Sequence, residues 1–532
     1  MIVGKYTEIF NPVRMSVNEP IITRENDMVP NRGGGYGFYI DPVRQLRRFL
    51  ILGSDSPTYY ASAQEMTKEN CGNIIKIIQS GDVKFLDEIV TVSYEGLAPK
   101  NDAALFALAL VYVFGNESLK WAATGKFNKI VRTASHLFQF RKYLKDMGKG
   151  NGRSVRGAIS GWYNQFKDRP EALAMQVVKY QNRNKWSHRN VALLAHVKPA
   201  TMDISGILGW AVGKSSLIAN EEARGIIEAY EEIKRSTDSK FIAEKLKEFR
   251  LPWEIVPTDQ RDKTMWRALI PHMGSTALIR NIRNMSKTGA ISVGGDGVAH
   301  MEALCGKLQD EKQLRSDRIH PLHLLVALKE LQKDTDFIIP PVLKSLENAF
   351  YKAFKYQESS GKRFMIGVDV SGSMKRGEVA GCPQIEPWEG AGLLALQLVK
   401  SEPKTLVYGF AHSTLNLNVT DNDNMDSLRN KLLRSDFGST NPGALIRFAL
   451  EKSIPVDVFI VITDNEANSG HHPSQVLKEY RNKMNNNAKM VVISMTPVNY
   501  SIADPKDQGQ MDVVGFDSSV PAIIQNFAKD SF

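Results

Sequence analysis

Four apolar, β-branched runs in the last third of the chain have the length of strands, and helical stretches separate them. The runs are RFMIGVDV, KTLVYGFAH, DVFIVITD and KMVVISMTP, and the stretches are PWEGAGLLALQLVKSE, NPGALIRFALEKS and SQVLKEYRNKM. Continuous apolar strands that alternate with helices are typical of a parallel sheet covered on both faces. Residues 359–532 are therefore predicted to form a doubly wound α/β domain.

The preceding part of the chain follows a different pattern. Between residues 40 and 355, segments such as DPVRQLRRFLILG and SKFIAEKLKEFR place apolar residues at the i, i+3, i+4 spacing of helices. Many medium-length helices joined by short turns predict a helical-repeat array over residues 1–358, with a loop-like start over 1–35. The small, polar segment ESSGKR at 358–363 is the expected boundary between the two domains.

The most apolar run, AALFALALVYVFG at 103–115, is too short to span a bilayer and is expected to be a buried helix. Cys71, Cys305 and Cys382 are scattered without a CxxC pair, and the N-terminus has no apolar signal segment. These features predict a cytoplasmic protein without a disulfide framework, a structural zinc site or a membrane anchor.

The two predicted domains differ in charge. From residue 361 onward there are 17 Lys and Arg against 19 Asp and Glu, which leaves 51 against 39 in the residues before it. A basic domain joined to a slightly acidic one suggests that the basic one meets a polyanion. The alternative is that the positive charge serves solubility alone.

Oxygen-bearing side chains follow the ends of two predicted strands. Asp369 lies near the end of the first run, and Ser371 and Ser373 follow it. Asp464 ends the third run, and Thr440 lies in a loop that leads into a helix. Parallel sheets bind ligands at the carboxyl ends of their strands, and hard oxygen donors with several neutral hydroxyls suit Mg²⁺ or another divalent cation. The alternative is a strand-to-helix turn in which a serine is the N-cap.

The order DxSxS, Thr, Asp resembles the metal-ion-dependent adhesion site of von Willebrand factor A domains, and the resemblance covers 361–532. It implies a metal site with no ligand missing, formed by Asp369, Ser371, Ser373, Thr440 and Asp464. Such a site leaves a coordination position for water or for an acidic group of a partner.

Two basic clusters lie between the predicted helices. Lys149, Arg153 and Arg156 flank a glycine-rich turn, where backbone amides and cations can hold phosphates. A second cluster is interleaved with Tyr180 and Trp186, as suits unpaired RNA, and consists of Lys179, Arg183, Lys185, His188 and Arg189. The alternative is a solvated helix face with Trp186 in the core.

Five separated segments resemble the TROVE module of the Ro sixty-kilodalton autoantigen family. They are GGGYGFYIDPVRQLRRFLILGSDSPTYY, GKGNGRSVRGAISGWY, KYQNRNKWSHRN, MWRALIPHMGSTALIRNIRNMSK and RIHPLHLLVALK. That family is a ring of HEAT-like helical repeats closed by a von Willebrand A domain. The resemblance therefore implies this architecture for nearly the whole chain, closed within one chain and hence monomeric.

The resemblance also implies a function. Ro proteins bind small noncoding Y RNAs on the outer basic face of the ring and single-stranded 3′ ends of misfolded RNAs in its central hole. They act as ribonucleoprotein scaffolds in RNA quality control and stress survival. In bacterial members the Y RNA tethers the exoribonuclease polynucleotide phosphorylase, which implies the same kind of partner here if the source is bacterial.

The same resemblance assigns residues. In that family the histidine of the WSH element contributes to Y RNA binding, which points to His188 here, although a hydrogen-bonded structural histidine is the alternative. Lys179 and Arg183, on the same segment, are added as candidates by their proximity to it. Arg280 and Arg283 share a helix face and are weaker candidates for the ring lining. Lys185 stands where relatives often have glycine, which alters the turn and adds positive charge.

Two other functions compete with the RNA scaffold. One is a Mg²⁺-dependent protein-adhesion scaffold without a role in RNA binding. The other is a metal-dependent nuclease or phosphatase, which is disfavoured because only two carboxylates can be placed and Glu466 alone does not form a catalytic centre. A non-enzymatic protein is expected.

Overall fold

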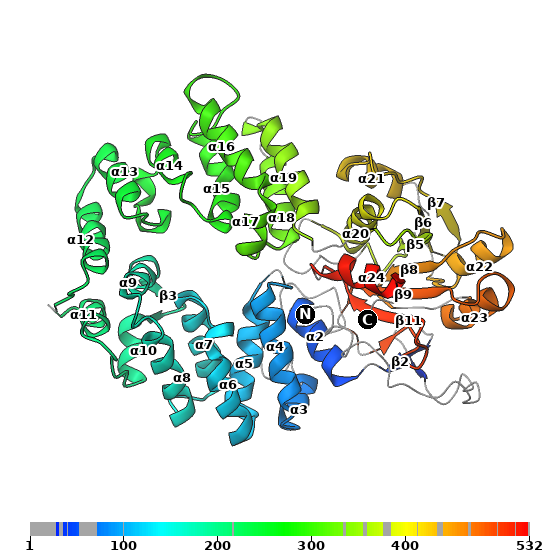
Figure 1. Cartoon of the computed structure of the whole chain (residues 1–532), viewed down its shortest axis with the longest axis horizontal. Coiled ribbons are helices and arrows are strands. Elements are labelled where there is room, and N and C mark those ends of the chain that lie inside the picture. Colours follow the sequence, from blue (N-terminus) through cyan, green and yellow to red (C-terminus); the bar gives the residue numbers. More distant parts are fainter. Residues whose placement is uncertain are drawn as a thin grey trace. The chain divides into compact units, whose positions relative to one another are not determined.

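The computed structural model describes residues 28–30, 36–39, 41–52, 72–98, 100–214, 217–333, 337–354, 359–375, 385–411, 413–433, 440–465, 470–496, 498, 500–516 and 518–529. Glu466, Cys71 and Cys382 lie outside these residues. The chain divides into two compact units, one of residues 67–96 and 101–353 and the other of residues 1–66, 97–100 and 354–532 (Figure 1).

The first unit is helical, as the spacing of apolar residues predicts. Its helices are α3 (Gly72–Gln79), α4 (Val83–Glu95), α5 (Asp102–Phe114), α6 (Glu117–Ile130), α7 (Ala134–Asp146), α8 (Arg153–Asn164), α9 (Pro170–Lys179), α10 (His188–Leu194), α11 (Met202–Ala211), α12 (Glu221–Arg235), α13 (Ser239–Glu248), α14 (Lys263–Leu269), α15 (Ser275–Lys287), α16 (Val298–Gln309), α17 (Glu311–Ser316), α18 (Pro321–Gln332) and α19 (Pro340–Lys352). A two-residue hairpin, β3 (Asn182–Arg183) and β4 (Trp186–Ser187), connects α9 to α10.

The first helices of this unit stack in two layers. Helix α5 packs on α3 and α7, whereas α6 packs on α4 and α8, so that every second helix lies in the same layer. This arrangement is typical of helical repeats, in which each pair of helices completes the core of the next. Residues 103–112 of α5 are buried, which confirms the buried helix expected there.

Side-chain caps set where these helices begin. The apolar pattern of residues 126–148 is continuous, yet the structure has two helices, α6 and α7. The break falls at Thr133, whose hydroxyl accepts a hydrogen bond from the His136 amide and so starts α7. Asn116 and Asp238 cap α6 and α13 in the same way.

The second unit is built on a six-stranded sheet in the order β11-β9-β8-β5-β6-β7. Its strands are β5 (Phe364–Asp369), β6 (Thr405–Phe410), β7 (Thr414–Asn416), β8 (Val458–Thr463), β9 (Lys489–Ser494) and β11 (Gln510–Val514), and its helices after the first strand are α20 (Pro387–Ser401), α21 (Met425–Leu432), α22 (Ala444–Glu451), α23 (Pro473–Lys483) and α24 (Val520–Lys529). All strand pairs are parallel except β6 with β7, because the connection between these two is too short for a crossover helix.

Both faces of this sheet are covered. Met365, Phe459 and Val461 pack in one core cluster with residues of α22 and α23. The alternate residues Ile366 and Ile460, which point to the other face, are also fully buried. The predicted doubly wound sheet is therefore confirmed, with an antiparallel strand added at one edge.

The N-terminal residues depart from the expected arrangement. Strands β1 (Met28–Pro30) and β2 (Tyr36–Tyr39) form a small antiparallel sheet with β10 (Tyr500–Ser501), and α2 (Pro42–Leu52) packs against β11. The described part of the first 52 residues thus belongs to the α/β unit, not to the helical one. Pairing between strands so distant in the sequence leaves no local pattern, which is why a loop was expected over residues 1–35.

Candidate metal centre and basic surface

The two predicted metal-binding carboxylates lie at the ends of adjacent strands. Asp369 is the last residue of β5, and Asp464 follows the last residue of β8. Because β5 and β8 are parallel, with Val368 opposite Ile462, both carboxylates reach the same edge of the sheet. Both are buried.

Thr440 reaches this edge from a different loop. The backbone amide of Asn441 donates a 2.9 Å hydrogen bond to the carbonyl of Ala411, the residue that follows β6. A 3.0 Å hydrogen bond from the Val370 amide to the Phe410 carbonyl joins the ends of β5 and β6. The loops after β8, β5 and β6 therefore meet at one place, as the order of these strands requires.

Hydroxyl groups surround the Asp369 carboxylate. Thr463 Oγ1 donates to Asp369 Oδ2 over 2.6 Å, and the Ser371 amide donates to Oδ1 over 2.9 Å. The Ser371 and Ser373 hydroxyl oxygens lie 3.0 Å apart. Residues 371–375 form turns instead of the start of a helix, so they do not act as a helix cap.

The chemistry of these groups fits a divalent cation. Burial raises the pKa of Asp369, and the hydrogen bonds from Thr463 and Ser371 act in the opposite direction. Among the described residues its donors are neutral, so a bound cation would balance a buried charge that is otherwise uncompensated. No group of three or more His, Cys, Asp or Glu that could hold a metal ion is found in the described part of the chain. The donors gathered at this edge are instead two carboxylates and several hydroxyls.

The basic hairpin is held on helix α7. Asn184 and Lys185 have φ values of 53° and 65°, the left-handed conformation of a tight two-residue hairpin turn. Arg183 Nη1 donates to Ser135 Oγ over 2.7 Å, and Asn184 Nδ2 donates to Gln139 Oε1 over 2.5 Å. Lys185 therefore occupies a position that favours glycine, and its turn is nevertheless formed.

Arg141 joins the hairpin to the glycine-rich turn. Its guanidinium carbon lies 4.7 Å from the ring centroid of buried Trp186, and its Nη1 donates to the Gly150 carbonyl over 3.3 Å. The two basic clusters, separate in the sequence, therefore lie around the same helix, α7. Sequence reasoning missed Arg141, although an arginine within the apolar pattern of α7 is a signal for a buried, partnered cation.

His188 is a core residue. It is 2 % exposed, its Nδ1 lies 2.9 Å from the Tyr163 hydroxyl, and its ring packs against those of Phe138 and Trp162. Burial lowers its pKa from 6.5 to about 3, so the ring is neutral at physiological pH. The ring thus anchors the hairpin to α8 from inside, as the alternative of a hydrogen-bonded structural histidine describes, and a contribution of His188 to RNA binding stays a prediction.

The other predicted RNA-binding residues differ in their exposure and in their place on the helical unit. Six cations around α7 have exposed side chains: Lys149, Arg153, Arg156, Arg183, Lys185 and Arg189. Lys179 is half-buried, with its amine 3.4 Å from Glu254. Arg280 is exposed and Arg283 half-buried on α15, which packs against α16 and α18 and is not brought together with the α7 cluster.

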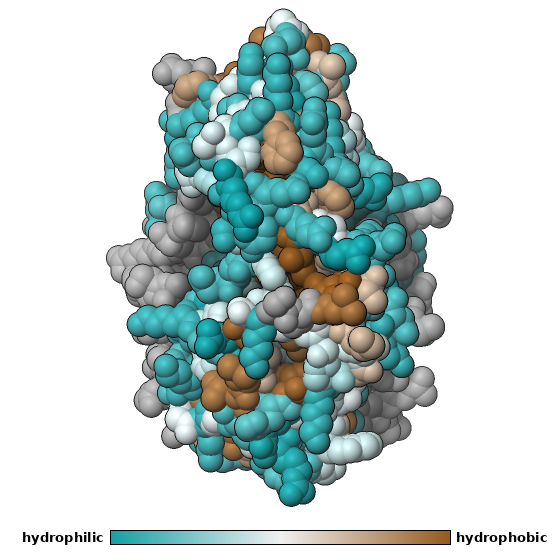
Figure 2. Space-filling view, turned by 90° about the vertical axis from the view of Figure 1, so that its left-hand side faces the viewer, coloured by the Kyte–Doolittle hydropathy of each residue, from teal (hydrophilic) through white to brown (hydrophobic). Residues whose placement is uncertain are grey.

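The face of the helical unit that includes α11 and α12 is mostly hydrophilic, with separate apolar areas (Figure 2). The exposed large apolar side chains near these helices are Leu193, Leu194, Met202 and Leu217. None of the described helices has the length and apolar character needed to span a membrane.

A helical-repeat unit with a basic surface, followed by an α/β unit with an oxygen-lined strand edge, defines a helical-repeat protein with a von Willebrand A domain. The TROVE domain family model matches residues 29–252 and 245–337, and the Ro60 vWA domain model matches residues 363–528. This chain belongs to the Ro60 family of TROVE-domain proteins.

Individual relatives agree along the whole length. A Deinococcus radiodurans protein named RNA-binding protein RO60 is 32% identical, with 98% of each chain covered. A Caenorhabditis elegans protein of the same name is 30% identical, with 94% of this chain and 90% of the other covered. The crystal structure of the Deinococcus radiodurans RO (RSR) protein superposes with a TM-score of 0.70 at 31% identity, covering 92% of this chain and all of that one.

Proposed function

We propose that this chain is a non-enzymatic RNA-binding scaffold that takes a small noncoding Y-type RNA on the surface around α7. The observation that carries the proposal is the gathering of six exposed cations from two separate segments around one helix. The relatives named as RNA-binding proteins support the same class of ligand.

The chemistry of this surface suits a folded RNA. Lysine and arginine side chains meet phosphates, and the exposed turn at 148–152 contains three glycines. A Cβ added at Gly150 or Gly152 would have nothing within 4 Å, so a phosphate can approach the backbone amides there. Binding by such contacts depends on backbone charge and shape more than on base sequence.

The finer roles follow the family and are part of the same proposal. The chain would also bind single-stranded 3′ ends of misfolded structured RNAs, in RNA quality control and stress survival. An exoribonuclease such as polynucleotide phosphorylase is the proposed protein partner, and the cytoplasm is the proposed location. A monomer is the proposed state.

For the α/β unit we propose a Mg²⁺ site held by Asp369, Ser371, Ser373, Thr440 and Asp464. A bound Mg²⁺ supplies a coordination position that an acidic side chain of a partner protein can occupy. The second candidate function is a Mg²⁺-dependent protein-adhesion scaffold without RNA. The buried Asp369 carboxylate favours the metal in both cases.

The experiment that tests RNA binding compares two double variants across a salt series, with a folded Y-like RNA and with a duplex that carries a single-stranded 3′ tail. Arg153→Ala with Arg156→Ala removes two cations of the α7 surface. Lys240→Ala with Lys247→Ala removes two exposed cations of α13 and is the matched control.

We expect the first double variant to weaken RNA binding. The association constant should also fall less steeply with salt, with a log–log slope shallower by about 1.5, because two fewer phosphates are neutralised. The control variant keeps the wild-type slope. Equal RNA binding by all three proteins would overturn the proposed surface. A third outcome is that the chain binds neither RNA but captures a protein, in a way that needs Mg²⁺ and survives nuclease treatment. That outcome would favour the adhesion scaffold over the RNA scaffold.

A further inference from the structure

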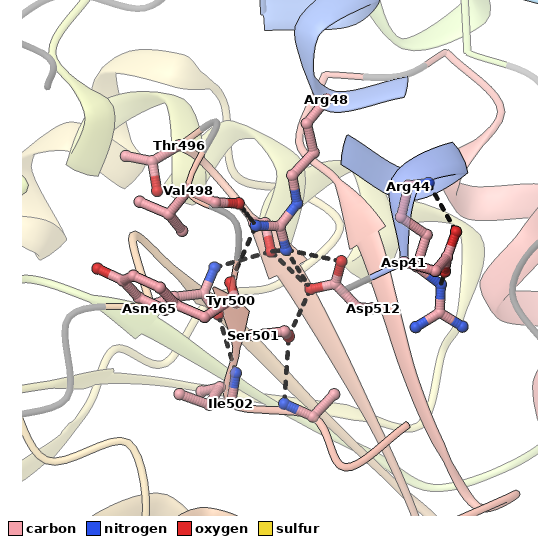
Figure 3. A network of polar contacts seen from close by, with 12 residues as sticks. Asp41, Arg44, Arg48, Asn465, Thr496, Val498, Tyr500, Ser501, Ile502 and Asp512 are labelled. Atoms are coloured by element: carbon pink, nitrogen blue, oxygen red, sulfur yellow. Dashed lines mark hydrogen bonds and ion pairs between the residues drawn. The ribbon is translucent and has the colours of Figure 1, made fainter. Parts of the chain in front are cut away.

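A buried arginine from the N-terminal helix enters the core of the α/β unit (Figure 3). Arg48 of α2 is 1 % exposed, and its Nη2 lies 2.7 and 2.8 Å from the two carboxylate oxygens of Asp512. Nη2 also donates to Ser494 Oγ over 2.8 Å, and Nη1 donates to the carbonyls of Val498 and Tyr500, the latter over 3.0 Å. One side chain thus ties α2 to three segments of the unit.

The directions of the hydrogen bonds around Ser494 are fixed by its single proton. Its hydroxyl donates to Asp512 Oδ1 over 2.7 Å. Its oxygen therefore accepts from both Arg48 and Asn465, whose Nδ2 lies 2.8 Å away. Ser494 is the link between the arginine and Asn465.

Asn465 continues this path to the candidate metal centre. Its backbone amide donates to Thr463 Oγ1 over 3.2 Å, and that hydroxyl donates to Asp369 Oδ2 over 2.6 Å. Its side-chain oxygen accepts the Ile502 amide over 3.2 Å. An unbroken, buried path of hydrogen bonds therefore runs from Arg48 to the Asp369 carboxylate.

The conformation of Asn465 depends on these contacts. It is fully buried with φ of 68°, in the left-handed region that asparagine adopts more readily than other residues with a side chain, when its polar group is hydrogen-bonded. It directly follows Asp464, so its conformation helps to fix the loop that carries that carboxylate. Contacts that hold Asn465 in this conformation also hold the loop that presents Asp464.

We propose that Arg48 is a positioning residue for the metal centre, acting through Ser494 and Asn465, and that binding of a divalent cation is thermodynamically linked to docking of helix α2. The inference rests on the proposed metal site. Linkage is reciprocal, so the cation must also protect α2 from opening. Groups beyond the direct ligands change metal affinity because they orient those ligands.

The test uses the full chain with Mn²⁺ as the probe, its binding followed by electron paramagnetic resonance and α2 opening by amide hydrogen exchange. Arg48→Lys keeps the charge but loses the planar array of donors. Arg481→Lys is the matched control, because Arg481 pairs with Asp507 over 2.5 Å in the same unit, near the start of β9. Ser494→Ala removes the link together with its hydrogen bond to Asp512. Its control is Ser286→Ala, a buried serine of the helical unit whose hydroxyl donates to the Phe337 carbonyl.

We expect Arg48→Lys and Ser494→Ala each to weaken Mn²⁺ binding about tenfold, with both controls within about twofold of wild type. In wild type, saturating Mn²⁺ should slow amide exchange in α2, and Ser494→Ala should abolish this slowing. Unchanged Mn²⁺ affinity and exchange in folded Ser494→Ala would overturn the role of Arg48 while leaving the metal site intact. Absence of Mn²⁺ binding by wild type would overturn the metal site and this inference together.

Discussion

The imidazole Nδ1 of His188 lies 2.9 Å from the hydroxyl oxygen of Tyr163, in the core between α10 and α8. Because of this contact, His188 has a structural role that differs from the role of the exposed cations around it. The cations can meet RNA, whereas the histidine holds the segment that carries three of them, Arg183, Lys185 and Arg189.

His188→Ala should therefore reduce stability before it reduces affinity. Removing a packed ring and leaving the Tyr163 hydroxyl without its partner should lower the free energy of unfolding by about 3 kcal/mol, as urea denaturation would measure. Tyr163→Phe, which removes only the hydroxyl, should cost about 1 kcal/mol and leave RNA binding nearly unchanged. Weakened RNA binding by His188→Ala with unaltered stability would show that the ring contacts RNA after all.

Acid should destabilise the protein through the same histidine. The pKa of His188 is about 3 in the folded chain and 6.5 as its ordinary value, so the unfolded chain gains a proton that the folded chain does not. Stability that is present above pH 6.5 is then lost as pH falls from 6.5 toward 3, by about 2 kcal/mol at pH 5. The gap in unfolding free energy between wild type and His188→Gln should narrow by that amount between pH 7 and pH 5. A gap that stays constant over this range would contradict the prediction.

Lys185 offers a way to separate turn strain from charge. Lys185→Gly relieves a left-handed conformation and should stabilise the protein by about 1 kcal/mol while weakening RNA binding. Lys185→Ala keeps the strained backbone and loses the same charge, so it should weaken RNA binding without a gain in thermal stability. If both variants bind RNA as wild type does, Lys185 lies outside the RNA contact.

Mg²⁺ should raise the melting temperature of wild type, and chelation by EDTA should reverse the rise. At a concentration one hundred times its dissociation constant, the ion would add about 2.7 kcal/mol to the free energy of unfolding. Asp369→Asn should abolish this response. The control is Asp457→Asn, which removes a carboxylate paired with Arg363 near the start of β8. A Mg²⁺ response that persists in Asp369→Asn would place the ion elsewhere.

The sequence predicts much of the fold and of the candidate metal centre, because both follow from the local pattern of apolar and polar residues. The apolar runs mark β5, β6, β8 and β9, and the carboxyl ends of neighbouring parallel strands must meet, which brings Asp369 and Asp464 to one edge. The left-handed turn at Lys185 was also foreseeable, since glycine is the expected residue there.

What the sequence could not predict depends on contacts between distant residues. The sequence left open whether Trp186 and His188 lie on the surface or in the core. Both are buried because Arg141 of α7 and Tyr163 of α8 partner them. Arg44, Arg47 and Arg48 are all buried on α2, and three arginines on a buried helix indicate buried ion pairs. No pattern near them in the sequence identifies Asp512 as the partner of Arg48.

The pairing of Arg48 with Asp512 spans 464 positions of the chain. At the usual 5–20 residues per second of protein synthesis, a nascent chain waits roughly 20–90 s between making the helix and making its acceptor. During that interval three arginines and an apolar face of α2 have no native site. Completion of the α/β unit is thus also the moment at which the newly made chain can first bury helix α2, and a polypeptide that ends before β11 never can.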